Sequence, residues 1–166
     1  IPKIVCGNGL DITKEIGRET IQNQNLFFRS NDGQFDPDVL YRVGIGDMAI
    51  SFHKNRVSFA IRKISEKQQP QSEQAHANKP QIPAMEYLVW DITFEGSQTC
   101  FPTGVENVPS VYRFFGNGSS VGRLIELHKK IIYEDLYPGI DLVFYMDNKK
   151  QFKYDFIIKP GADISS

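Results

Sequence analysis

YEDLYPGIDLVFYMDNKKQFKYDFIIKPGAD, residues 133–163, is the stretch that decides the fold. Apolar side chains recur at every second position over 140–146 and again over 152–158, a period that is typical of β-strands. Tyr137-Pro138-Gly139 precedes the first of these segments, four polar residues separate the two, and Pro160-Gly161 follows the second. Because proline and glycine end strands and favour turns, the stretch predicts an antiparallel hairpin.

The same alternation recurs upstream of this hairpin. Residues 48–52 and 57–61 alternate on either side of Lys54-Asn55, which predicts a second hairpin, and residues 86–94 form another alternating segment. Shorter strands are expected at 3–6, 39–43, 111–115 and 129–133. So many one-sided strands predict an all-β fold in which two antiparallel sheets pack as a β-sandwich-like domain with long loops and little helix.

The length of 166 residues suits a single domain with a sizeable core. Residues 1–25 are expected to be an amino-terminal segment with one helical turn near 13–17, and residues 26–64 a first β section. Residues 65–84 contain five glutamines and three prolines, which predicts an exposed, mobile loop or linker. Residues 85–166 are then the second β section of the same domain.

Composition argues against several classes of partner. The formal net charge is -1 and lysine and arginine are scattered, so no basic stripe points to nucleic acid. The longest apolar runs are strand-sized and fall well short of the ~20 residues of a spanning helix, so no membrane span is expected. The chain begins with Ile1 and without a leader pattern, so it is expected to be a processed or excised piece.

The two cysteines, Cys6 and Cys100, lie far apart and in no zinc-like spacing. In an exported protein they are candidates for a disulfide, whose long loop would stabilise the fold by about 4 kcal/mol in the chain-entropy model. The alternative is two unrelated buried thiols. No cofactor is predicted; calcium is a weak candidate, held by Asp135, Asp141 and carbonyls near Gly139, since no D-x-D-x-D spacing is present.

No catalytic residue is predicted. His53, His76 and His128 are isolated from one another and from cysteine, and His53 and His76 are expected to be solvated. No serine lies in a G-x-S-x-G elbow. Acids around the last hairpin, which glycoside hydrolysis would require as a pair, fall on turns and outer faces. These acids are Glu134, Asp135, Asp141, Asp147 and Asp155.

Several motifs carry a family resemblance. Three segments together resemble a domain of large secreted bacterial proteins. They are the N-x-G-Q element of Asn31, Gly33 and Gln34 with the VLYRV that follows it, the VYRFFGN of residues 111–117, and residues 133–163. It is the amino-terminal domain that precedes SBBP β-propeller-type repeats in surface proteins of the Bacteroidetes type, often linked to type IX secretion.

The resemblance implies a β fold, export through the bacterial envelope and an extracellular or cell-surface location, and it supplies no catalytic residues. The family pattern continues beyond PGAD, which implies that the second β section is truncated at its carboxyl end.

Aromatic residues divide into expected core and expected surface. Trp90, Phe152, Tyr154 and Phe156 are predicted to point inward. A contact surface is predicted around the last hairpin, at Tyr133, Tyr137, Pro138, Gly139 and Tyr145.

These observations predict a non-enzymatic structural or interaction module with a role in adhesion. It would cap or dock downstream β repeats of the same polypeptide, or bind a protein partner. The alternatives are a carbohydrate-binding module that holds a surface glycan on exposed tyrosines, and a glycoside hydrolase-like enzyme.

Overall fold

The computed structural model describes residues 3–5, 26–63, 86–109, 112–114 and 123–164, and within these ranges it is all-β with no helix. The strands are β1 (Lys3–Val5), β2 (Phe28–Ser30), β3 (Tyr41–Ile45), β4 (Met48–Phe52), β5 (Arg56–Lys63), β6 (Glu86–Thr93), β7 (Thr103–Asn107), β8 (Tyr112–Phe114), β9 (Arg123–Ile125), β10 (Leu127–Tyr137), β11 (Ile140–Met146) and β12 (Phe152–Ile158). The predicted fold class is confirmed.

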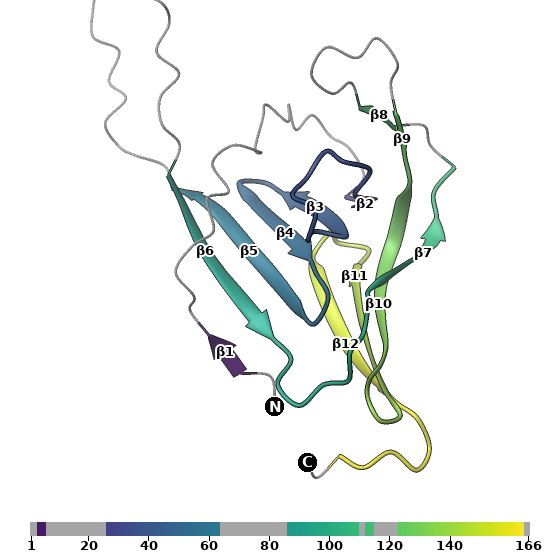
Figure 1. Cartoon of the computed structure of the whole chain (residues 1–166). Helices are drawn as coiled ribbons and strands as arrows, with labels where there is room; N and C mark the ends of the chain where they lie inside the picture. The colour runs from purple at the N-terminus through teal and green to yellow at the C-terminus, as the bar shows by residue number, and fades with distance from the viewer. Residues whose placement is uncertain (1–2, 6–25, 64–85, 110–111, 115–122, 165–166) are drawn as a thin grey trace, which may run out of the picture.

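One large antiparallel sheet runs in the order β1-β6-β5-β4-β3-β2-β10-β11-β12, with β7 also paired to β10, while β8 and β9 form a separate ribbon. The large sheet curls, so that β12 passes behind β4 and β5 (Figure 1). Ring centroids of Phe52 on β4 and Phe144 on β11 are 5.2 Å apart, and those of Phe59 on β5 and Phe152 on β12 are 6.4 Å apart. The two halves of one sheet therefore face each other as a sandwich does.

The core lies between these two halves and is built by the alternating positions of the strands. Residues on the inner face of one half meet those of the other, and burying them removes apolar surface from water, which is the main favourable term in folding. The largest fully buried side chains are Tyr133, Phe28, Phe52, Ile50, Ile131, Leu136, Leu142, Val43 and Val57.

Both predicted hairpins are present. β4 and β5 pair from Met48↔Ile61 to Phe52↔Val57, and β11 and β12 pair from Ile140↔Ile158 to Met146↔Phe152. Asn55, in the first turn, has a φ of 78°, a conformation that asparagine tolerates better than most residues.

Other strands differ from prediction. The strand expected at 39–43 begins at Tyr41, because Val39 is buried in the loop that precedes it. The strand expected at 129–133 is the middle of the longer β10. β7 (TGVEN) was not predicted; it has no apolar alternation and is a strand because it pairs with β10. Its Gly104 lies so close to the His128 ring that a Cβ there would meet ring atoms at 2.5 Å.

Some predictions lie outside the described residues: the helical turn at 13–17, the loop or linker at 65–84 and the state of Cys6. In the part of the chain that the structure describes, no helix is long and apolar enough to cross a membrane.

Candidate functional site

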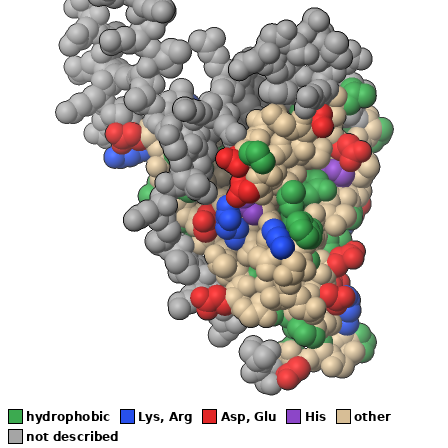
Figure 2. Space-filling view, in the orientation of Figure 1, with side chains coloured by type: hydrophobic (Ala, Val, Ile, Leu, Met, Phe, Trp, Pro, Cys, Tyr) green, Lys and Arg blue, Asp and Glu red, His purple; other side chains and the backbone are tan. Residues whose placement is uncertain are grey.

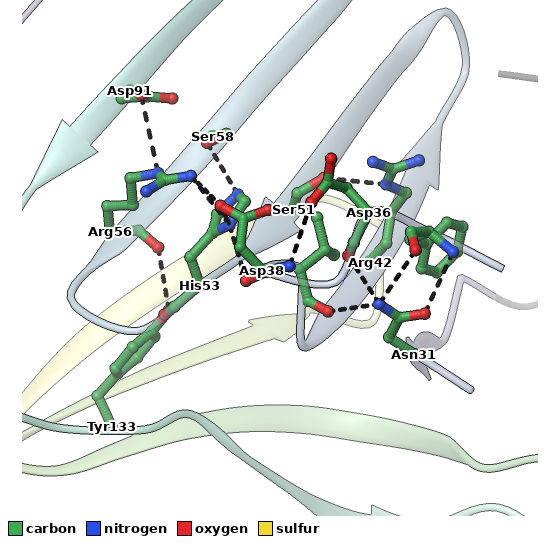
Figure 3. Close-up of polar contacts among 12 residues, drawn as sticks. Asn31, Asp36, Asp38, Arg42, Ser51, His53, Arg56, Ser58, Asp91 and Tyr133 are labelled. Carbon is green, nitrogen blue, oxygen red and sulfur yellow. Dashed lines mark hydrogen bonds and ion pairs between the residues drawn. The ribbon is translucent and has the colours of Figure 1, made fainter. Parts of the chain in front are cut away.

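Asn31 organises the loop that carries the first part of the site. Its side-chain Oδ1 accepts hydrogen bonds from the backbone N–H groups of Gly33 (3.0 Å) and Phe35 (3.1 Å). Its Nδ2 donates to the carbonyl oxygens of Val39 (2.7 Å) and Asp36 (2.9 Å). One amide thus ties both ends of the loop together, which explains the asparagine of the N-x-G-Q element. The closed loop presents Asp38 to the turn between β4 and β5 (Figure 3).

His53, immediately after β4, lies at the centre of a polar cluster (Figure 3). Its Nδ1 is 3.0 Å from the Asp38 carbonyl oxygen and 3.1 Å from Asp38 Oδ2, and its Nε2 is 3.0 Å from Ser58 Oγ. Carbonyl and carboxylate oxygens only accept hydrogen bonds, so Nδ1 carries the proton, and Nε2 of the neutral ring accepts from the Ser58 hydroxyl. His53 is only 5% exposed, so the expectation that it is solvated is wrong.

Arg56 and two acids surround this histidine. The Arg56 guanidinium forms an ion pair with Asp38, and its Nε lies 3.9 Å from Asp91 Oδ2 on β6. Burial lowers the pKa of His53, and the positive charge of Arg56 lowers it further. The ring is therefore neutral near pH 7. Figure 2 shows acidic, basic and histidine side chains gathered side by side on this face of the molecule.

Ser58, His53 and Asp38 are in contact in the same order as the residues of a serine hydrolase triad. Triad chemistry also requires a nucleophile that a substrate can reach and N–H donors for the oxyanion. Ser58 is only 8% exposed and lies within β5, paired with Ser51 on one side and Asp91 on the other. The arrangement suits a buried link between loop and sheet better than acyl transfer.

Tyr133 joins the cluster to the core from the opposite side of the sheet. Its hydroxyl donates to the carbonyl oxygen of His53 at 2.7 Å and lies 3.3 Å from that of Arg56. Tyr133 has no exposed surface, so its predicted place on a contact surface is wrong. The reason is that Tyr133 shares the inner face of β10 with Ile131, and its polar end reaches the turn between β4 and β5.

The other predicted contact residues do not form a tyrosine platform. Tyr137 is half-buried and its hydroxyl donates to the carbonyl of Glu95 at 3.1 Å. Pro138 is exposed, Gly139 is half-buried with a φ of 74°, and Tyr145 is half-buried. With Tyr133 in the core, the tyrosines of this region are divided between interior and surface.

The two calcium candidates, Asp135 and Asp141, are brought together, but an ammonium group lies between them. Lys159 Nζ is 2.9 Å from Asp135 Oδ1 and 2.8 Å from Asp141 Oδ1. The hydrogen bond from Lys159 lowers the pKa of Asp141, and the two carboxylates raise the pKa of Lys159. The Lys159 ammonium group therefore neutralises the carboxylates at the place where a calcium ion would bind. Among the residues described, no group of three metal-ligating residues occurs.

Cys100 is buried, and its Sγ lies 3.1 Å from the carbonyl oxygen of Glu134. Burial raises the pKa of the Cys100 thiol, and nearby carboxylates raise it further, so the reduced side chain is protonated near pH 7. Its pairing with Cys6 stays a prediction, because Cys6 lies outside the described residues.

A family model described as a domain of unknown function (DUF7948) matches residues 28–166. The chain belongs to the DUF7948 family. The match spans the Asn31 loop, the His53 cluster and the last hairpin. No curated protein and no solved structure matches the chain.

The DUF7948 domain ends its large sheet on β12, which no other described strand covers on its outer edge. Tyr154 is 59% exposed, Phe156 38% and Ile158 54%, although all three occupy inner-face positions. Ile157, on the opposite face, is 50% exposed. The prediction that Tyr154 and Phe156 are inside is therefore wrong: the two side chains do lie on the apolar face of β12, but no described strand packs over that face at the edge of the sheet.

Sequence reasoning missed the His53 cluster because its members come from three separate places in the chain: a loop, a turn and a strand. No spacing rule connects Asp38, His53 and Ser58. The only local signal was the N-x-G-Q element of the DUF7948 domain, which marks the loop that positions Asp38.

Proposed function

We propose that this DUF7948 domain is a non-enzymatic interaction module of an exported bacterial surface protein, and that β12 is the strand through which it makes contact. The observation that carries the proposal is the set of exposed apolar side chains on both faces of β12, whose outer edge is paired with no other strand in the described part of the chain. Large exposed apolar residues on an edge strand favour association, because an unpaired edge is a template for another strand.

The edge is continuous with the core, which favours a partner that extends the sheet. Phe152 packs against the core, its ring stacked on Phe144 with centroids 5.6 Å apart, and Tyr154 follows at 6.1 Å from Phe144. Phe156 then meets Tyr154 edge-on at 6.2 Å. An added strand would lengthen this aromatic row and complete the sandwich on that side, by the mode in which a peptide adds to a sheet edge.

Two parts of the proposal, the cell-surface location of the protein and the docking of downstream repeats, are supported by the motif resemblance. A carbohydrate-binding module is less well supported, because Tyr133 is buried and Tyr137 uses its hydroxyl within the domain.

Site-specific photo-crosslinking tests the proposal in the cells that produce the protein. A photoreactive phenylalanine analogue in place of Tyr154 is expected to give protein adducts, since this position faces the contact. The same analogue in place of Asn148, which is exposed in the turn between β11 and β12, is the matched control. Equal adduct yields at the two positions would contradict a contact at the β12 edge.

Acyl transfer is the second candidate, favoured by the 3.0 Å contact between Ser58 Oγ and His53 Nε2. If the cluster is structural, a fluorophosphonate probe is expected to leave Ser58 unlabelled, because a buried hydroxyl cannot reach the phosphorus atom. Intact-mass measurement after incubation checks this, with Ser58→Ala as the control. A covalent adduct on the wild-type chain that is absent from Ser58→Ala would establish a reactive serine instead.

A further inference from the structure

Two histidines are buried at the places where separate segments are fastened to the large sheet. His53 lies under the Asn31 loop, residues 31–40 between β2 and β3, and His128 lies against β7. We infer that this pair of neutral histidines makes the domain sensitive to acid: protonation of His53 loosens the Asn31 loop, and protonation of His128 loosens β7. The inference is independent of the contact role proposed for β12.

His53 uses both of its ring nitrogens while it is neutral. Its Nδ1 donates to the carbonyl of Asp38, and its Nε2 accepts from the hydroxyl of Ser58, each at 3.0 Å. A second proton would reverse the bond at Nε2 and would set a positive ring beside Arg56, whose Nη2 lies 3.3 Å from His53 Nδ1. Because His53 is only 5% exposed, water does little to screen the two like charges.

Two carboxylates oppose this effect without cancelling it. Burial and the charge of Arg56 lower the pKa of His53, whereas Asp38 from the loop and Asp91 from β6 raise it, and the net change is downward. From the other side, the Tyr133 hydroxyl bonds to the His53 carbonyl rather than to the ring. Acid therefore favours an open loop, in which the charged ring reaches water.

His128 is more isolated than His53. Its side chain is only 4% exposed, and neither of its ring nitrogens has a hydrogen-bond partner among the residues that the structure describes. The ring packs against Gly104 of β7 and lies 5.4 Å from the ring of Tyr41 at an angle of 84°. Burial lowers the pKa of His128, and Glu126, whose Oε2 is 3.6 Å from Nε2, only partly opposes this effect.

β7 depends on the contact with the neutral ring. None of its five residues is buried, so the strand adds no side chain to the core. An ion pair joins Glu106 to Lys130 of β10, but it lies on the surface, where such pairs contribute little to stability. A positive charge on the His128 ring therefore favours detachment of the strand, because the imidazolium can then be solvated.

The sign of the pH dependence follows from the two lowered pKa values. In the open segments each histidine binds a proton with its ordinary pKa of about 6.5, and in the closed segments with a lower pKa. The open forms therefore bind more protons, and the stabilisation of the closed forms is lost progressively as the pH falls below about 6.5. Carboxylates titrate mainly below about pH 4.5, so the interval from pH 7 to pH 5 reports on the histidines.

Amide hydrogen exchange of the full 166-residue chain, followed by NMR at pH 7 and pH 5, tests the inference. Protection factors, which correct for the intrinsic effect of pH, are expected to fall by about tenfold at Val39 and Val108, whose N–H groups bond to Asp36 and Leu127. Amides of the β11–β12 ladder are the control and are expected to keep their protection. Unchanged protection at Val39 overturns the inference for the loop, unchanged protection at Val108 overturns it for β7, and an equal loss in the control ladder overturns both.

Variants at His128 identify the group that titrates. His128→Phe keeps a ring and loses no hydrogen bond between described residues, so it is expected to fold and to give the same protection of Val108 at both pH values. Glu126→Gln changes a mostly exposed side chain and is expected to deepen the loss at pH 5, because it removes the carboxylate that favours the charged ring. A wild-type pH dependence that persists in His128→Phe shows that another group is responsible.

His53→Asn makes the corresponding test for the loop. It keeps an amide donor next to Asp38 and removes the titrating ring, so protection of Val39 is expected to be lower than in the wild type at pH 7 and the same at pH 5. NMR titration of the imidazole resonances of the wild type provides a test that needs no folded variant. Both rings are expected to titrate below about pH 6.5, and a buried histidine that titrates above this value overturns its part of the inference.

Discussion

Tyr133→Ala is expected to lower the free energy of unfolding by about 3–5 kcal/mol, the range observed when a large aromatic side chain is removed from a core. Tyr133 is fully buried, and its ring centroid lies 5.3 Å from that of Phe94 and 6.1 Å from that of Phe144. The loss therefore combines lost burial with a cavity. Urea unfolding followed by fluorescence of the single tryptophan measures the change.

Tyr133→Phe separates the ring from the hydroxyl. It keeps the packing but removes the hydrogen bond to the His53 carbonyl, and it is expected to cost about 1–2 kcal/mol. If Tyr133→Phe destabilises the domain as much as Tyr133→Ala, the hydroxyl rather than the ring dominates. If neither variant changes stability, the buried position of Tyr133 is wrong.

Asn31→Ala is expected to cost about 2–3 kcal/mol, because the substitution removes the hydrogen bonds that the Asn31 side chain makes to both sides of the loop. Asn31→Asp keeps the oxygen that accepts from Gly33 and Phe35 but sets a carboxylate oxygen against the Val39 and Asp36 carbonyl oxygens, so a loss of similar size is expected. Urea unfolding measures both variants.

The loss should also reach the His53 cluster, since the loop delivers Asp38 to the histidine. The His53 ring resonances in an NMR spectrum are expected to shift in Asn31→Ala. Asn148→Ala, an exposed turn position, is the control and should change stability by less than about 0.5 kcal/mol. Equal effects at Asn31 and Asn148 would show that the loop does not depend on the asparagine amide.

The two hairpins were predictable because the information for each is local. A strand of the 140–146 segment and its partner at 152–158 are joined by a short turn, and the alternation of their residues sets both register and face. The unpredicted β7 shows the limit. Its TGVEN sequence has no strand pattern. The segment is a strand because it pairs with β10, and Gly104 allows the close approach because it has no Cβ to clash with the His128 ring.

The candidate site was less predictable than the fold. His53 was expected in solvent because it lies next to a turn, yet the Asn31 loop folds over it and brings Asp38 to its ring. Conversely, Tyr154 was expected inside because it lies on an apolar stripe, yet the stripe reaches beyond the last covered strand. The exposure of each residue therefore depends on how segments distant in sequence are arranged around it, which a local pattern does not contain.

By itself, the sequence determined the two hairpins of this DUF7948 domain, the turns within them and the alternation of their apolar side chains, because these depend on residues a few positions apart. Only the tertiary structure decided which faces are covered. The curl of the sheet buries Tyr133 and places β12 last among the described strands, because burial depends on which strands end up opposite each other, and strand order depends on contacts between residues far apart in the chain.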